Sequence, residues 1–91
     1  MDNIEIKEQK VKAGKYLFVV EVGTTDKTIH KVTLDRDYWQ YLSDKKITPG
    51  QLILTSFMFL LNHESKESIL KEFDLKDINR YFPEYEEFIR K

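Results

Sequence analysis

Residues 63–67, His-Glu-Ser-Lys-Glu, place one imidazole and two carboxylates within about one helical turn. Imidazole and carboxylate groups bind zinc, and the helical HExxH motif uses two histidines four residues apart with its glutamate as general base. Here Glu67 stands where the second histidine should be, and the only other histidine, His30, is distant in the sequence. A favourable position of His63 near the carboxyl end of a helix explains the pattern better. We therefore expect no metal site and no cofactor.

The remaining reactive groups give no catalytic pattern either. The acidic pairs Asp35/Asp37 and Glu86/Glu87 suit the first turns of helices, where negative charge is stabilising. No nucleophile has a base near it in the sequence, and there is no cysteine for a thiolate nucleophile, a disulfide or a metal ligand. A glycine-rich phosphate loop is also missing, because the glycines are isolated at positions 14, 23 and 50. We expect that the protein is not an enzyme.

Composition limits the class of protein further. The 91 residues are 41% hydrophobic and 13% aromatic, which is enough for one modest core, so we expect residues 1–91 to form a single domain. The net charge of -1 gives no general basic field that would attract nucleic acid. The N-terminal residues are too charged for a signal peptide, and the longest apolar run, residues 57–61, is too short to span a membrane. We expect a cytoplasmic protein without membrane contact.

The first third of the chain has strand periodicity. Residues 16–22 are rich in β-branched and aromatic side chains, and residues 28–34 alternate between apolar and polar, with a glycine-containing turn between them. This pattern predicts an antiparallel β-hairpin over residues 16–34. Residues 1–15 are polar apart from the alternating Ile4 and Ile6, which leaves two alternatives: a third, edge strand, or an arm that becomes ordered on a partner.

Residues 35–91 are expected to form a bundle of short helices packed against this hairpin, giving an α+β fold. Residues that can cap helices mark several starts, and Thr48-Pro49 is the clearest of them. The expected helices are a short one from Asp35 to about Ser43, one from Pro49 to about His63, one after Ser65 that carries Ile69, Leu70 and Phe73, one after Asp74 that carries Leu75, Ile78 and Tyr81, and a last short one after Pro83.

The helix from Pro49 has more apolar surface than one buried stripe requires. Its expected core stripe consists of Ile53, Leu54, Phe57, Leu60 and Leu61. Leu52 and Phe59 are seven residues apart, so they lie on one line outside this stripe, with Met58 on the opposite flank. Either the terminal helices of the same chain cover that line, or a second copy or another protein does. Our main hypothesis is a non-enzymatic binding protein that forms a homodimer or docks to a protein partner through Leu52, Met58 and Phe59.

Residues 30–61, HKVTLDRDYWQYLSDKKITPGQLILTSFMFLL, are similar in spacing to the ribbon-helix-helix repressors. In that family, a dimer pairs its single strands into a ribbon that reads the major groove of DNA. The resemblance implies that Lys31 and Thr33 point outward to bases and that Arg36 lies near a phosphate. Residues 68–81 could also form a helix-turn-helix. A small DNA-binding regulator of either type is therefore the alternative function, with nucleic acid a less favoured partner than protein.

The C-terminal half supplies one more resemblance and one more expectation. Residues 56–88, SFMFLLNHESKESILKEFDLKDINRYFPEYEEF, together with HKVTL at 30–34, resemble small prokaryotic proteins of about this length, and this resemblance implies no activity. The last residues are too apolar for a free tail. We expect this segment to pack on the fold through Tyr81, Phe82, Tyr85, Phe88 and Ile89.

Overall fold

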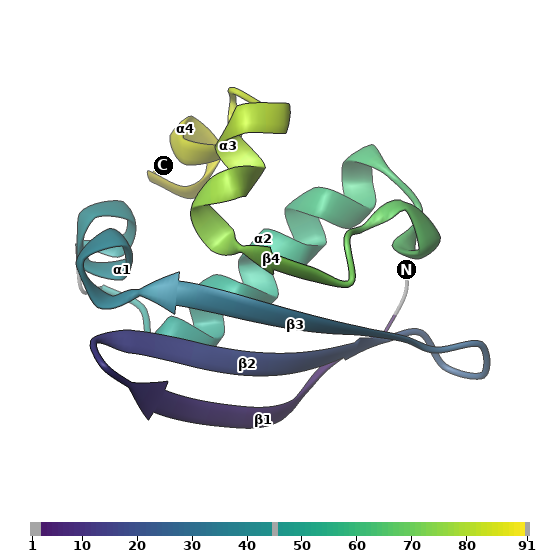
Figure 1. Ribbon diagram of the computed structural model, residues 1–91. Helices are drawn as coiled ribbons and strands as arrows, with labels where there is room; N and C mark the ends of the chain where they lie inside the picture. The colour runs from purple at the N-terminus through teal and green to yellow at the C-terminus, as the bar shows by residue number, and fades with distance from the viewer. Residues whose placement is uncertain (1–2, 45, 91) are drawn as a thin grey trace.

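The computed structural model describes residues 3–44 and 46–90. Within these residues, four strands form a single sheet, and the helices gather on one side of it (Figure 1). The strand order is β1-β2-β3-β4; the first three strands are antiparallel to one another, and β4 runs parallel to β3. The strands are β1 (Ile4–Lys12), β2 (Lys15–Val22), β3 (Thr28–Asp35) and β4 (Glu72–Asp74).

The predicted hairpin over residues 16–34 is confirmed as the pair β2–β3, whose register runs from Tyr16 opposite Leu34 to Val22 opposite Thr28. Alternation determines which face is buried, because successive side chains of a strand point to opposite sides. Phe18 and Val32 face each other in the core, whereas the neighbouring Lys31 remains exposed. Residues 4–12 form the edge strand β1, which is one of the two alternatives left open by the sequence.

The α+β class is also confirmed. The α-helices are α1 (Arg36–Ser43), α2 (Pro49–His63), α3 (Ile78–Tyr81) and α4 (Tyr85–Arg90), and short 3-10 turns occur at η1 (Lys66–Ser68) and η2 (Leu75–Asp77). The start of α2 is defined by a capping box: the Thr48 hydroxyl accepts from the Gln51 amide, and the Gln51 side chain accepts from the Thr48 amide. No helix in the described parts of the chain is long and apolar enough to cross a membrane.

The prediction of a helix after Ser65 is wrong. Only the η1 turn forms there, and residues 72–74 instead add β4 to the sheet beside residues 31–33 of β3. Two tertiary hydrogen bonds explain the difference, since the Lys31 amide donates to the Lys71 carbonyl and the His30 ring bonds the Leu70 carbonyl. Such contacts override a weak local preference for helix. A three-residue strand is also too short to produce a period that sequence analysis can detect.

The C-terminal helix closes the core over α2. Tyr85 is fully buried, and its hydroxyl bonds the hydroxyl of Ser56 on α2. The ring of Phe59 lies among three C-terminal aromatic rings, with centroid distances between 5.1 and 5.9 Å, from Phe82, Tyr85 and Phe88. The end of the chain therefore packs on the fold, as its apolar composition predicts.

Candidate functional site

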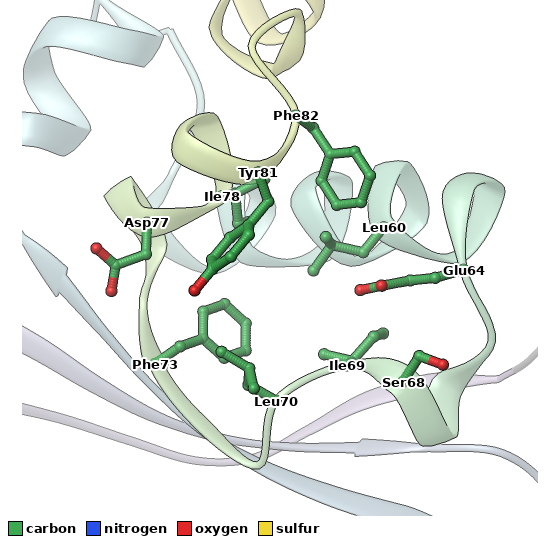
Figure 2. Close-up of a pocket in the computed structure, with 10 residues that line it drawn as sticks. All are labelled: Leu60, Glu64, Ser68, Ile69, Leu70, Phe73, Asp77, Ile78, Tyr81 and Phe82. Atoms are coloured by element: carbon green, nitrogen blue, oxygen red, sulfur yellow. The ribbon is translucent and has the colours of Figure 1, made fainter.

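A cavity with mostly apolar walls lies where α2 ends, between the last turn of α2, the segment 68–73 and α3 (Figure 2). Its volume of about 400 Å³ is within the range of small-ligand and side-chain binding sites. The cavity is next to β4, at the opposite edge of the sheet from β1. It is lined by Leu60, Glu64, Ser68, Ile69, Leu70, Phe73, Asp77, Ile78, Tyr81 and Phe82.

The walls of this cavity are mostly apolar, and its mouth is open. Leu60, Ile69 and Ile78 are buried and form part of the core. Leu70 and Tyr81 line the cavity but are 53% and 69% exposed. Large apolar side chains at an open mouth leave surface that a bound group could remove from water.

Glu64 is one of the polar side chains that line the cavity, together with Ser68, Asp77 and Tyr81. Its carboxylate points inward, between Leu60 and Ile69 (Figure 2). Burial against these walls raises the pKa of Glu64, and the neighbouring His63 only partly offsets this effect. In residues 3–44 and 46–90, no hydrogen bond or ion pair satisfies this carboxylate. By contrast, Asp77 on the cavity wall is paired with Arg80 at 3.7 Å. The cavity thus combines apolar walls with one partly desolvated negative charge.

A buried histidine positions one side of the cavity. His30 on β3 is almost completely buried, and its Nδ1 lies 2.8 Å from the carbonyl oxygen of Leu70. Because a carbonyl only accepts, Nδ1 carries a proton and donates to it, and Nε2 forms a hydrogen bond with the Thr28 hydroxyl at 2.8 Å. The His30 ring also packs on Phe57. His30 is therefore a structural residue that holds the segment leading into β4.

A second polar cluster fixes β4 itself. Asp74 accepts from the Thr33 hydroxyl at 2.7 Å and from the Lys15 ammonium at 3.3 Å. The bond to Asp74, with further attraction from Asp35, raises the pKa of Lys15. These contacts join the C-terminal strand to β2 and β3, so the cavity wall formed by Phe73 rests on a fixed strand.

Two of the three residues expected at a protein interface lie inside the chain. Leu52 is 0% exposed and Phe59 is 2% exposed, whereas Met58 is 44% exposed. The C-terminal aromatic residues cover Phe59, as the alternative with intramolecular coverage expects. The extra apolar line on α2 is thus part of the core. Leu52 and Phe59 are not available to a partner in this fold, and only Met58 remains on the surface.

The described residues are not arranged as the resemblance to ribbon-helix-helix repressors implies. Lys31 and Arg36 are exposed, but the Thr33 hydroxyl is engaged with Asp74. β3 is paired on both sides, by β2 and by β4, so it cannot be the free single strand from which a dimeric ribbon is built. Residues 68–81 also lack two consecutive helices, because they contain β4 and the η2 turn before the short α3. The resemblance in spacing therefore does not extend to this arrangement of strands and helices.

The groups of the His-Glu-Ser-Lys-Glu segment do not converge. His63 bonds the Phe59 carbonyl through Nδ1, and its Nε2 lies 3.3 Å from the Glu84 carboxylate. Glu67 pairs with Lys66, while Glu64 points into the cavity. In the described part of the chain, no three side chains of the metal-binding types are grouped so that they could hold an ion.

Sequence reasoning did not select the residues of this cavity. They come from α2, the η1–β4 segment and α3, which meet only because β4 joins the sheet. The available signal was weak: the apolar pair Ile69-Leu70 lies between polar residues, and Glu64 follows the apolar part of α2. No protein-family model matches the chain, and no curated protein or solved structure is significantly similar to it.

Proposed function

We propose that this chain is a non-enzymatic binding protein that docks a segment of a protein partner in the cavity at the end of α2. The occupant is a large apolar side chain that lies next to a lysine or arginine in the partner. The observation that supports this proposal is the Glu64 carboxylate, which points into an apolar cavity and forms no ion pair with any residue of 3–44 and 46–90.

The chemistry of each part favours such a segment. Leu60, Ile69 and Phe73 offer apolar contact to a side chain that enters through the open mouth. A cation beside that side chain would neutralise Glu64 and replace the hydration that burial has removed. A negatively charged segment would instead be repelled by the same carboxylate, so the site selects by charge as well as by size.

A peptide titration tests the proposal. The probes are blocked tetrapeptides Gly-Leu-Lys-Gly, Gly-Leu-Glu-Gly and Gly-Ala-Lys-Gly, added to isotope-labelled protein while amide resonances are recorded by NMR. We expect the first peptide to shift the resonances of residues around the cavity, such as Leu70 and Tyr81. The charged contact should make it bind about fivefold more tightly than the glutamate peptide, which corresponds to about 1 kcal/mol for a partly exposed pair.

Glu64→Gln keeps the shape of the side chain and removes its charge, so it should abolish this preference for lysine. The matched control is Glu67→Gln, because Glu67 lies three residues further on, is exposed and does not line the cavity. Equal binding of all three peptides, or shifts confined to a different surface, would contradict the proposal. Binding by free amines but by none of the peptides would assign the cavity to a small cationic ligand and not to a protein.

A further inference from the structure

We propose that β1 pairs with the β1 strand of a second copy of this chain, antiparallel and about a two-fold axis, so that two sheets join into one. β1 is nine residues long and lies at the edge of the sheet, with β2 on one side and no described strand on the other. The unpaired backbone groups of such a long edge are a ready template for another strand. The question is which register a second copy would adopt.

A bulge in β1 determines which residues share a face. The register with β2 shifts between Ile6 and Glu8, which leaves Lys7 without a partner on β2. Ile6 lies opposite Val20 and Gln9 lies opposite Phe18, and both of these partners are buried. Both side chains therefore point to the helix-covered side. Without the bulge, residues three apart in a strand would point to opposite sides.

The α2 helix gives independent evidence for this orientation. Gly50 is in the first turn of α2. A Cβ atom at this residue would lie 3.6 Å from Ile6 Cδ1 and 3.6 Å from Gln9 Oε1, so both side chains reach α2. On the other face, Lys7 lies 3.7 Å from Glu5, so these two side chains are on the open side of the sheet. The register with β2 places Glu8 and Lys10 on this open side as well, opposite Val19 and Leu17.

One two-fold register fits this arrangement of faces. If the axis passes between Lys7 and Glu8, then Glu5 lies opposite Lys10 of the second copy, and Lys7 lies opposite its Glu8. Symmetry repeats both pairs, so every charge on residues 5–10 meets the opposite charge. On the helix-covered face, Ile4 lies opposite Val11 of the second copy. Val11 is 70% exposed in one chain, and this contact would cover it.

Neighbouring registers are unfavourable. A shift by one residue brings side chains of the covered face against side chains of the open face. A shift by two residues places Glu5 opposite Glu8 in one direction and Lys7 opposite Lys10 in the other. Charges and a bulge commonly protect an edge strand from pairing. Here they disfavour the neighbouring registers and favour a single one, and two-fold closure limits the assembly to two copies.

The proposed dimer is independent of the cavity at the end of α2. That cavity adjoins β4, and β1 lies at the opposite edge of the sheet, so both cavities stay open in a dimer. Failure of the peptide experiment would leave the strand pairing intact. Failure of the strand pairing would equally leave the cavity intact.

A charge exchange tests the pairing. Sedimentation velocity on the full chain at low ionic strength, at concentrations up to about 100 µM, should show a concentration-dependent dimer. Glu5→Lys and Lys10→Glu each create two like-charge contacts, and each should weaken dimerisation by at least about tenfold. The double variant Glu5→Lys/Lys10→Glu restores opposite charges in the same register and should recover the dimer. Circular dichroism verifies that all variants are folded, which is expected because both residues are exposed.

Lys12→Glu is the matched control. It makes the same charge change on the same strand, but in this register Lys12 lies opposite Asn3, so its effect should be much smaller than that of Lys10→Glu. A chain that is monomeric at every concentration would overturn the proposal. A dimer that none of the variants weakens, or one that the double variant fails to restore, would show that β1 does not pair in this register.

Discussion

The buried hydroxyl pair between α2 and α4 gives a quantitative test of how the C-terminal helix is held. Ser56 donates to the Leu52 carbonyl at 2.7 Å. A serine hydroxyl has one proton, so the Tyr85 hydroxyl must donate to Ser56 Oγ. Tyr85 is fully buried and no water can replace Ser56 as its acceptor without a change in packing. Loss of the Ser56 hydroxyl and loss of the Tyr85 hydroxyl should therefore lower the free energy of unfolding by different amounts.

Ser56→Ala leaves the buried Tyr85 hydroxyl without an acceptor. The cost of such an unsatisfied group is about 1 to 3 kcal/mol, which corresponds to a melting temperature lower by roughly 4–8 °C for each kcal/mol in a domain of this size. Tyr85→Phe removes the donor, while Ser56 keeps its bond to Leu52, so the loss should be about 1 kcal/mol. In the double variant, both polar groups are gone. We expect it to be more stable than Ser56→Ala alone.

Urea unfolding of the four proteins, followed by far-UV circular dichroism at pH 7, measures these differences. Ser65→Ala is a suitable control, because Ser65 bonds Ser68 at the surface and its loss should change stability by less than about 0.5 kcal/mol. Two results would refute the reasoning: a smaller loss for Ser56→Ala than for Tyr85→Phe, or additive losses in the double variant. Additivity would mean that the two hydroxyls do not interact.

Three further predictions concern pH and the C-terminal segment. Burial raises the pKa of Tyr38 and of Tyr85 above the ordinary value of 10.0, so the unfolded chain loses these protons first. Stability should therefore fall as pH rises above 10, and the double Tyr→Phe variant at these positions should show a shallower fall in urea midpoint; an unchanged slope would contradict this. Glu64 has a raised pKa in the folded chain, so its ionised form opposes folding. Glu64→Gln should then raise the urea midpoint slightly at pH 7 and leave it unchanged at pH 3, where the carboxyl group is protonated in both states; the reverse pattern would exclude desolvation as the cause. Truncation before Tyr81 removes the buried Tyr85, whose apolar surface alone contributes about 1.5 to 3 kcal/mol, and should leave the chain unfolded or aggregating. Hydrogen exchange of the intact chain should show protected amides in α4, and free exchange there would indicate that the segment is not docked.

Local patterns were sufficient for the elements with strong short-range signals. The alternating pattern over residues 28–34 and the β-branched and aromatic residues at 16–22 predicted the hairpin, because strand pairing within a hairpin requires only a turn between its strands. The pair Thr48-Pro49 predicted the start of α2 in the same way, because Thr can cap a helix and Pro suits its first position. The apolar composition of the last residues predicted that they pack on the fold, although it did not show where.

Only the tertiary structure decided what covers α2 and where β4 lies. The pattern of α2 shows that Leu52 and Phe59 must be covered, but it is the same whether a second copy or the C-terminal aromatic residues cover them. β4 depends on long-range bonds from His30 and Lys31 to a segment 40 residues away, and no local period records them. The cavity with Glu64 follows from this strand. The position of the cavity was therefore determined by contacts between parts of the chain that are distant in the sequence, and such contacts leave no local pattern.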